Sequence, residues 1–256
     1  MAPPSPFRRS VTGRVGVVAH RGLSAEEPEN TMRAFRRAAE VGCDLLEFDV
    51  HLSRDGEVVV IHDETLERTT DGRGLVRDHT LAELRSLDGG RGERIPTLDE
   101  VAGWARGTSL VLSCEIKQPV PASGAAPYGG IAERVVTILR DHGLERRALV
   151  HSFDHPTVRR VRELAADLPT SVNYGGGTFV DPLALARAAD ASGLGAWWAW
   201  LSLEVCAAAH RAGLHAHAWG MDQPPREEEV AMLVRAGVDT LDADDPRLLR
   251  RILDSL

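Results

Sequence analysis

Short apolar runs alternate with segments of helical period along almost the whole chain, and this alternation limits the fold more than any other feature. Strands are predicted at 14–20, 44–52, 109–117, 148–153, 170–175, 194–200, 214–220 and 238–244. Helices are predicted at 30–42, 97–106, 131–143, 155–167, 181–190, 202–213, 225–237 and 246–255. Strict alternation indicates a parallel sheet covered by helices. Eight such units in 256 residues predict an α/β fold, a closed (β/α)8 TIM-type barrel.

Three segments fall outside the alternation. The apolar run at 57–63 follows the turn signal Arg54-Asp55-Gly56 and is interpreted as an extension of the second strand. A polar, glycine-rich stretch then runs from about 64 to 95. Residues 1–12 contain Pro and Ser and are predicted to form a flexible tail. The alternative fold, an open doubly wound sheet, would require an early glycine-rich phosphate turn, which the sequence lacks.

Charge and cysteine content argue against several classes of protein. The net charge of −8 and the pI of about 5.7 disfavour a nucleic-acid partner. The three cysteines are scattered and odd in number, so we expect a reducing compartment and a cytoplasmic location. No apolar run approaches the roughly 18 residues of a membrane span, and no apolar signal-peptide segment follows the first arginines. We therefore expect no stable membrane anchor, and we leave the oligomeric state open.

Chemically active side chains gather near the carboxyl ends of the predicted strands, where (β/α)8 barrels build their active sites. They are His20 and Arg21 on the first strand, Glu47 and Asp49 on the second, His62 on its extension, Glu115 and Lys117 on the third, and Trp219 on the seventh. A barrel with no active site would more often carry small or turn residues at these positions. The sequence therefore predicts a functional site at this end of the barrel.

The carboxylates of this group favour a metal site. Glu47 and Asp49 are two residues apart, which puts both on one face of a strand, and Glu115 would point into the same mouth. Three carboxylates without a histidine favour a hard cation such as Mg²⁺ or Ca²⁺. The competing interpretation, three solvated loop acids, is weakened by their coincidence at matched strand ends. A zinc site at His215 and His217 is disfavoured because the histidines needed on neighbouring strands are missing.

The remaining residues suit phosphoryl chemistry. Arg21 and Lys117 would place two fixed cations beside the metal, where they could bind a phosphoryl group. Lys117 could instead pair with one of the carboxylates and only hold the barrel mouth. His20 and His62 are the candidate acid and base, because the ordinary histidine pKa of about 6.5 allows proton exchange near neutrality. One would take a proton from the attacking hydroxyl, and the other would give one to the leaving alkoxide.

Several linked motifs resemble the glycerophosphodiester phosphodiesterases. They are HRG, PENT, GCDLLEFDVHLSRDGEVVVIHDETLERTTDGRG, IPTLDEV and CEIK, in that order, followed by AWGMD and LVRAGVDTLDADDPRLL near the end of the chain. The resemblance covers roughly residues 15 to 252. It implies a (β/α)8 barrel domain over residues 13–256 with a small insertion after the second strand, at about residues 63–96.

The resemblance also implies an activity. It is the hydrolysis of a small-molecule glycerophosphodiester to sn-glycerol 3-phosphate and an alcohol, a reaction of lipid and glycerol metabolism. The implied cofactor is Mg²⁺ or Ca²⁺. The implied roles are metal binding by Glu47, Asp49 and Glu115, acid–base catalysis by His20 and His62, phosphate binding by Arg21 and Lys117, and a pocket wall at Trp219. A cyclic-phosphate route and direct attack by water both stay open.

Two alternatives to this activity are kept. A lysophospholipase D-like or other phospholipid-cleaving enzyme of the same superfamily would need an exposed apolar lip. A catalytically inactive phosphodiester-binding domain would more often have lost His20 or His62. The sixth strand ends in three tryptophans, among which Trp197 and Trp198 should point to opposite sides. Their rings could hold a quaternary ammonium such as choline or could pack beneath the helices.

Overall fold

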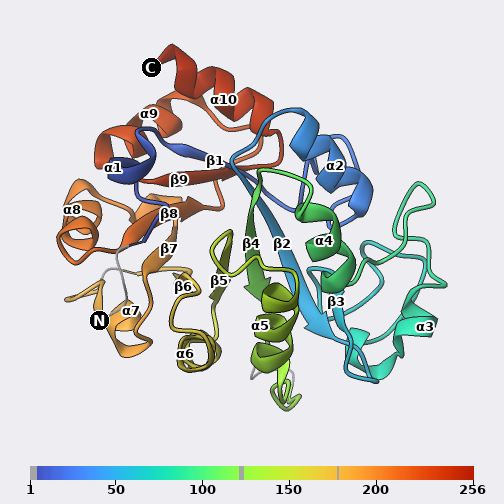
Figure 1. Cartoon of the computed structure of the whole chain (residues 1–256). Coiled ribbons are helices and arrows are strands. Elements are labelled where there is room, and N and C mark those ends of the chain that lie inside the picture. The colour runs from blue at the N-terminus through green and yellow to red at the C-terminus, as the bar shows by residue number, and fades with distance from the viewer. Residues whose placement is uncertain (1–4, 121–123, 178) are drawn as a thin grey trace.

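The computed structural model describes residues 5–120, 124–177 and 179–256. Within them, eight parallel strands form a closed barrel. They are β1 (Gly16–Ala19), β2 (Leu45–Leu52), β4 (Val111–Ile116), β5 (Ala148–Ser152), β6 (Thr170–Tyr174), β7 (Gly193–Trp197), β8 (His215–Trp219) and β9 (Thr240–Ala243). Pairing of β1 with both β2 and β9 closes the ring. The predicted (β/α)8 barrel is thus confirmed (Figure 1).

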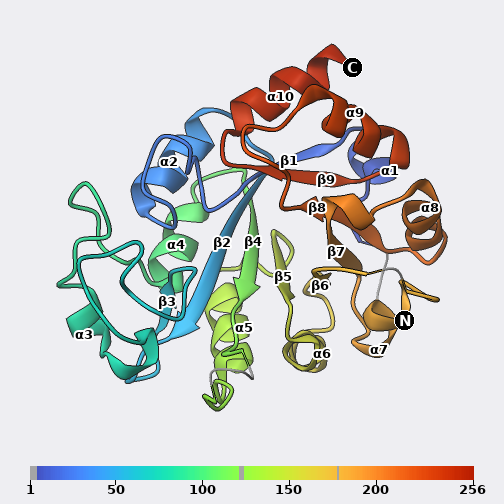
Figure 2. The ribbon, with the colours of Figure 1, turned by 180° about the vertical axis from the view of Figure 1, so that it is seen from behind.

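Helices surround the barrel, as Figure 2 shows from behind. They are α2 (Met32–Glu40), α4 (Leu98–Ala105), α5 (Ile131–Asp141), α6 (His155–Leu164), α7 (Ala184–Ala188), α8 (Leu203–Arg211), α9 (Glu227–Ala236) and α10 (Pro246–Ser255). Several begin at a side chain that accepts a hydrogen bond from the first turn, among them Thr31, Thr97 and Ser202. In the described part of the chain, no helix has the length and apolar character needed to cross a membrane.

The strands divide their side chains between two environments, as the period of two requires. Residues such as Leu46, Phe48 and Leu112 belong to the main apolar core, which the strands share with the helices. The residues between them in sequence, including Glu47 and Asp49, therefore face the interior of the barrel. The candidate site therefore lies in the polar interior of the barrel.

Residues 5–12 close the amino-terminal end of the barrel, and here the structure differs from the expected flexible tail. Phe7 is buried in a small apolar cluster with Val18, Leu45 and Leu149. Its ring meets His215 edge-on at 5.9 Å, and His215 Nδ1 lies 2.8 Å from Ser5 Oγ. The short helix α1 (Arg9–Thr12) follows. A single aromatic residue in a polar segment has no periodic signal, so the sequence does not reveal this packing. Residues 1–4 lie outside the described residues.

The segment between β2 and α4 forms a small lobe beside the barrel (Figure 1). Strand β3 (Val58–Val60) runs antiparallel to the end of β2, and the one-turn 3-10 helix η1 (Val76–Asp78) and α3 (Leu81–Leu84) follow. The lobe has its own apolar cluster, made of Val59, Ile61, Leu66, Val76, Leu84 and Ile95. The lobe includes the stretch of about residues 63–96 where the insertion is expected, and it begins earlier, at β3.

Candidate active site

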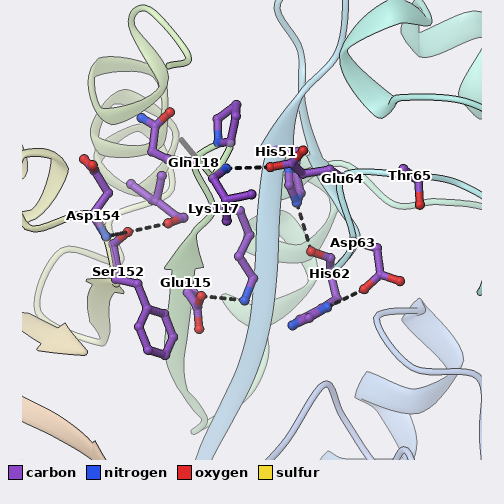
Figure 3. Close-up of a pocket in the computed structure, with 14 residues that line it drawn as sticks. His51, His62, Asp63, Glu64, Thr65, Glu115, Lys117, Gln118, Ser152 and Asp154 are labelled. Carbon is purple, nitrogen blue, oxygen red and sulfur yellow. Dashed lines mark hydrogen bonds and ion pairs between the residues drawn. The ribbon is translucent and has the colours of Figure 1, made fainter. Parts of the chain in front are cut away.

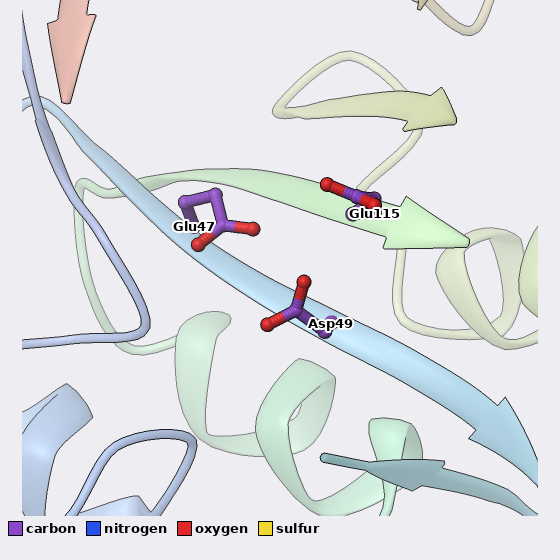
Figure 4. A group of neighbouring side chains, drawn as sticks. All are labelled: Glu47, Asp49 and Glu115. Atoms are coloured by element: carbon purple, nitrogen blue, oxygen red, sulfur yellow. The ribbon is translucent and has the colours of Figure 1, made fainter. Parts of the chain in front are cut away.

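Three buried carboxylates, Glu47, Asp49 and Glu115, converge inside the barrel (Figure 4). Asp49 lies opposite Glu115 in the parallel register of β2 and β4, and Glu47 precedes Asp49 on the same face. One oxygen atom of each carboxylate lies within 4.8 Å of the others. Because β2 continues to Leu52, the two acids of this strand lie within it rather than at its end. The structure therefore brings together the three residues that the sequence predicts as metal ligands.

The negative charge of this cluster is poorly compensated. Burial raises the pKa of Glu47, and repulsion from Asp49 raises it further. Burial also raises the pKa of Glu115, against the opposing charge of Lys117. A cluster of carboxylate oxygens with no nitrogen or sulfur ligand suits hard cations such as Mg²⁺ and Ca²⁺. The three residues could therefore hold a divalent cation.

Lys117 contacts two of the three acids. Its Nζ atom lies 2.9 Å from Asp49 Oδ1 and 2.5 Å from Glu115 Oε1. Burial alone would raise the pKa of Asp49, but Lys117 and the other nearby cations hold it well below its usual range. Lys117 thus compensates Asp49 most strongly and leaves Glu47 without a comparable partner.

Arg21 connects the carboxylate cluster to the lobe. Its backbone N–H donates to Glu47 at 3.0 Å, and its side chain donates to Glu29 at 2.9 Å. Glu29 also accepts from Arg68, which pairs with Asp63 at 2.6 Å. Arg21 holds a left-handed backbone conformation with φ of 56°, which costs a non-glycine residue on the order of 1 kcal/mol or more. The surrounding contacts hold it there and aim its N–H at the cluster.

Each predicted catalytic histidine is paired with an aspartate through the same ring nitrogen. His20 Nδ1 lies 2.8 Å from Asp244 Oδ1, and His62 Nδ1 lies 2.6 Å from Asp63 Oδ1. A carboxylate at Nδ1 fixes the orientation of the ring and leaves Nε2 to exchange a proton. The two pairs share one arrangement, although Asp63 is adjacent to His62 in sequence and Asp244 lies 224 positions from His20.

The environments of the two histidines shift their pKa values in opposite directions. Burial by itself would lower the pKa of His20, but the bond to Asp244 and the charge of Glu47 outweigh it and raise the pKa to about 9. Burial lowers the pKa of His62 below its ordinary value, and the charge of Asp49 offsets this only in part. At neutral pH the site thus holds one protonated and one neutral imidazole, the two states that an acid–base pair needs.

Two supporting residues escaped the sequence analysis. Asp244 is separated from His20 by 224 positions, and only the pairing of β1 with β9 brings them together. His51 places one ring nitrogen 3.0 Å from the carbonyl oxygen of His62 and the other 3.0 Å from the Tyr128 hydroxyl. The signals available in the sequence were an acidic residue directly after the last strand and a further polar residue on the inward face of β2. Neither signal specifies a partner.

The aromatic residues near the mouth differ in their exposure. Trp219 meets Phe153 edge-on at 5.2 Å, and Phe153 is 47% exposed. Trp197 is 37% exposed, and its indole N–H donates to the carbonyl oxygen of Gly220. The predicted sixth strand, β7, ends at Trp197, and Trp198–Trp200 form the 3-10 helix η3, whose two tryptophans pack partly against the core. Trp197 therefore faces the mouth of the barrel, whereas Trp198 and Trp200 pack against the apolar core.

A cavity of about 640 Å³ opens beside the predicted catalytic residues (Figure 3). His62, Glu115 and Lys117 line one part of it, and Phe153 lines another. Trp219 does not line this cavity but supports the ring of Phe153. The arrangement can accommodate a phosphate next to Lys117 together with an attached group of considerable size.

Comparisons with known proteins show which proteins this chain resembles. The model of the "Glycerophosphoryl diester phosphodiesterase family" matches residues 20–248. A "Glycerophosphodiester phosphodiesterase" of Caldanaerobacter subterraneus subsp. tengcongensis is 38% identical over 240 residues, which cover 91% of this chain and 95% of that protein.

Solved structures show the same likeness. A glycerophosphodiester phosphodiesterase from Agrobacterium tumefaciens str. C58 superposes with a TM-score of 0.77 and 27% identity, over 93% of this chain and 99% of that one. A phosphodiesterase from Oleispira antarctica, solved in complex with the product sn-glycerol-3-phosphate, superposes with a TM-score of 0.82 and 27% identity, over 95% and 98% of the two chains.

Proposed function

Because the chain belongs to the glycerophosphoryl diester phosphodiesterase family and is thereby a glycerophosphodiester phosphodiesterase, we propose that it hydrolyses its substrate to sn-glycerol 3-phosphate and an alcohol, using a divalent cation and two histidines. The observation that carries this proposal is the convergence of the three carboxylates with two oppositely shifted histidines at one barrel mouth. The product bound to the Oleispira antarctica relative supports the choice of substrate.

Glu47, Asp49 and Glu115 would hold Mg²⁺ or Ca²⁺. When bound, such a cation supplies Lewis-acid chemistry, since it offsets charge on phosphate oxygens and acidifies a nearby hydroxyl. Arg21 and Lys117 supply the fixed cations of the site and would bind the phosphate. Lys117 lies between Asp49 and Glu115, so a phosphate bound to it lies next to the acidic cluster.

His20 and His62 would move the protons. The neutral imidazole takes a proton from the attacking oxygen, and the protonated imidazole gives one to the departing alkoxide. Asp244 and Asp63 keep the two rings oriented throughout. A neighbouring glycerol hydroxyl and a water molecule are both suitable nucleophiles, and both routes use the same pair of histidines.

The first test is the release of glycerol 3-phosphate from glycerophosphocholine, glycerophosphoethanolamine and glycerophosphoglycerol. Each substrate is assayed with and without chelator, followed by addition of Mg²⁺ or Ca²⁺. We expect release that chelation abolishes and one of the two metals restores. Release that is insensitive to chelation would contradict the role of the cation, and no release from any diester would contradict the function.

Exposed apolar side chains keep one alternative substrate class under test. Val120, Phe153 and Trp197 are 59%, 47% and 37% exposed, and a lysophospholipid would cover such groups with its acyl chain. Lysophosphatidylcholine therefore belongs in the same assay. Its cleavage at a rate above that of glycerophosphocholine would favour the lysophospholipase D-like activity.

We propose a cytoplasmic location without a nucleic-acid partner. Cys43, Cys114 and Cys206 are unpaired and buried, which is typical of proteins from reducing compartments. The net charge of −8 would repel a polyanion. Labelling of the intact protein with a thiol reagent before and after denaturation tests the state of the cysteines.

A further inference from the structure

The cavity beside the catalytic residues is larger than a phosphate requires. Its volume of about 640 Å³ falls within the range of about 300–1,000 Å³ that is usual for ligand sites. One part is lined by His62, Glu115 and Lys117, and the rest lies between the start of the lobe and the loops that follow β4 and β5. A group attached to a phosphate at Lys117 can therefore extend into this space (Figure 3).

Much of the wall beyond Lys117 is apolar. Pro119, Val120 and Phe153 line it. Glycerol hydroxyls placed against such a wall would lose hydrogen bonds to water without gaining others. The cavity therefore suits the alcohol half of a diester better than the glycerol half, which finds polar partners among the carboxylates and histidines of the barrel interior.

Phe153 presents an aromatic surface that is held in place. Its ring meets Trp219 edge-on, with an interplanar angle of 83°, and it keeps 47% of its surface exposed. Gly175 lies next to both rings, since a Cβ atom there would be 3.8 Å from each. The ring is thus ordered by its neighbours and open to a ligand.

The charges that line the cavity differ between its inner and outer parts. Lys117 is the one Lys or Arg that lines it among the described residues, and it pairs there with Glu115. The carboxylates of Asp63, Glu64 and Asp154 also line the cavity. Asp63 is compensated by Arg68, whereas the carboxylate of Glu64 accepts the backbone N–H of Val120 at 2.8 Å. Figure 3 shows Glu64 and Asp154 well apart from Glu115. A ligand with an anionic group at Lys117 and a cationic group farther out would match this pattern.

We propose that this cavity binds the alcohol half of the diester and selects alkylammonium alcohols of the choline type. The phosphate lies at Lys117, the ammonium group lies against the ring of Phe153, and Glu64 adds a favourable charge. The inference rests on the proposed function, because it concerns which glycerophosphodiester the same site prefers. Anionic alcohols are disfavoured by the carboxylates that line the outer part.

The test compares glycerophosphocholine with its uncharged isostere, the glycerophosphate diester of 3,3-dimethylbutanol. The two alcohols have the same shape and differ in charge. The readout is the ratio of kcat/KM for the charged and the uncharged substrate. Comparing this ratio between wild type and variants cancels the intrinsic difference between the two leaving groups.

Two variants change the cavity and one serves as the control. Phe153→Leu keeps an apolar side chain but removes the aromatic face, and Glu64→Gln keeps the acceptor for Val120 but removes the charge. Phe179→Leu is the control, because Phe179 is 42% exposed and does not line the cavity. We expect the ratio to fall about fivefold in Phe153→Leu and about twofold in Glu64→Gln, and to stay unchanged in the control.

Different failures have different meanings. An unchanged ratio in both cavity variants, or an equal loss of activity on both substrates, would overturn the selection of an ammonium group. If metal-loaded wild-type protein hydrolysed neither diester nor glycerophosphoglycerol, the proposed function itself would fail, and this inference with it. If the protein hydrolysed all three diesters and the cavity variants did not alter the ratio of the two kcat/KM values, the proposed function would stand and only the selectivity would be rejected.

Discussion

Replacement of Asp244 by Asn should change the protonation of His20 more than any other single substitution around that ring. Among the groups that raise the pKa of His20, the hydrogen bond to Asp244 is the largest, ahead of the charges of Glu47 and Asp242. Asparagine keeps an oxygen that can accept from Nδ1 but removes the negative charge. Burial, which lowers the pKa of His20, then meets less opposition.

The expected magnitude follows from the balance of these effects on the pKa of His20. In the wild type, a pKa of about 9 leaves about nine in ten His20 rings protonated at pH 8. In Asp244→Asn we expect the pKa of His20 to fall toward the ordinary value of about 6.5, so that most rings are neutral at pH 8. Because the folded pKa of His20 lies above its unfolded value, the stability that its protonation contributes is fully present below about pH 6.5 and is lost as the pH rises through about 9.

The measurement is an NMR titration of the histidine ring protons in the metal-free protein. The control is Asp63→Asn, which alters the same contact in the other pair. Its effect on the pKa of His62 should be smaller, because burial and the charges of Asp49, Lys117 and Arg21 all affect that pKa more than Asp63 does. An unchanged pKa of His20 in Asp244→Asn, or a larger change in the control, would refute the reasoning.

Three further outcomes are expected. Glu47→Gln should weaken the binding of Mg²⁺ or Ca²⁺ about tenfold or more in calorimetry, because it removes one of three anionic ligands. Lys117→Met should lower kcat/KM on every diester while strengthening metal binding, since the ammonium group competes for Asp49 and Glu115; weaker metal binding would contradict this. Phe7→Ala should lower the free energy of unfolding by about 3 kcal/mol in urea titrations, whereas Val11→Ala, at a position 65% exposed, should change it by less than about 0.5 kcal/mol.

Features that depend on neighbours in the chain could be read from the sequence alone. The periods of two and 3.6 predict the strands and helices, and their alternation predicts the barrel. The spacing of Glu47 and Asp49 puts them on one face of a strand whatever its partners are. Glu115 and Lys117 follow the same rule, and parallel strands carry their carboxyl ends to one edge. The carboxylate cluster was therefore predictable from the sequence, apart from the depth at which β2 holds its two acids.

Features that depend on barrel closure required the tertiary structure. Asp244 reaches His20 only because β9 pairs with β1. Phe7 is buried only because it covers apolar residues at the amino-terminal end of the closed barrel. The opposite pKa shifts of His20 and His62 arise from charges on several strands at once. Phe153, which has no motif around it, gained a role only from its place on the cavity wall next to Trp219. Local order is encoded in the spacing of residues, whereas burial and electrostatics are properties of the assembled barrel.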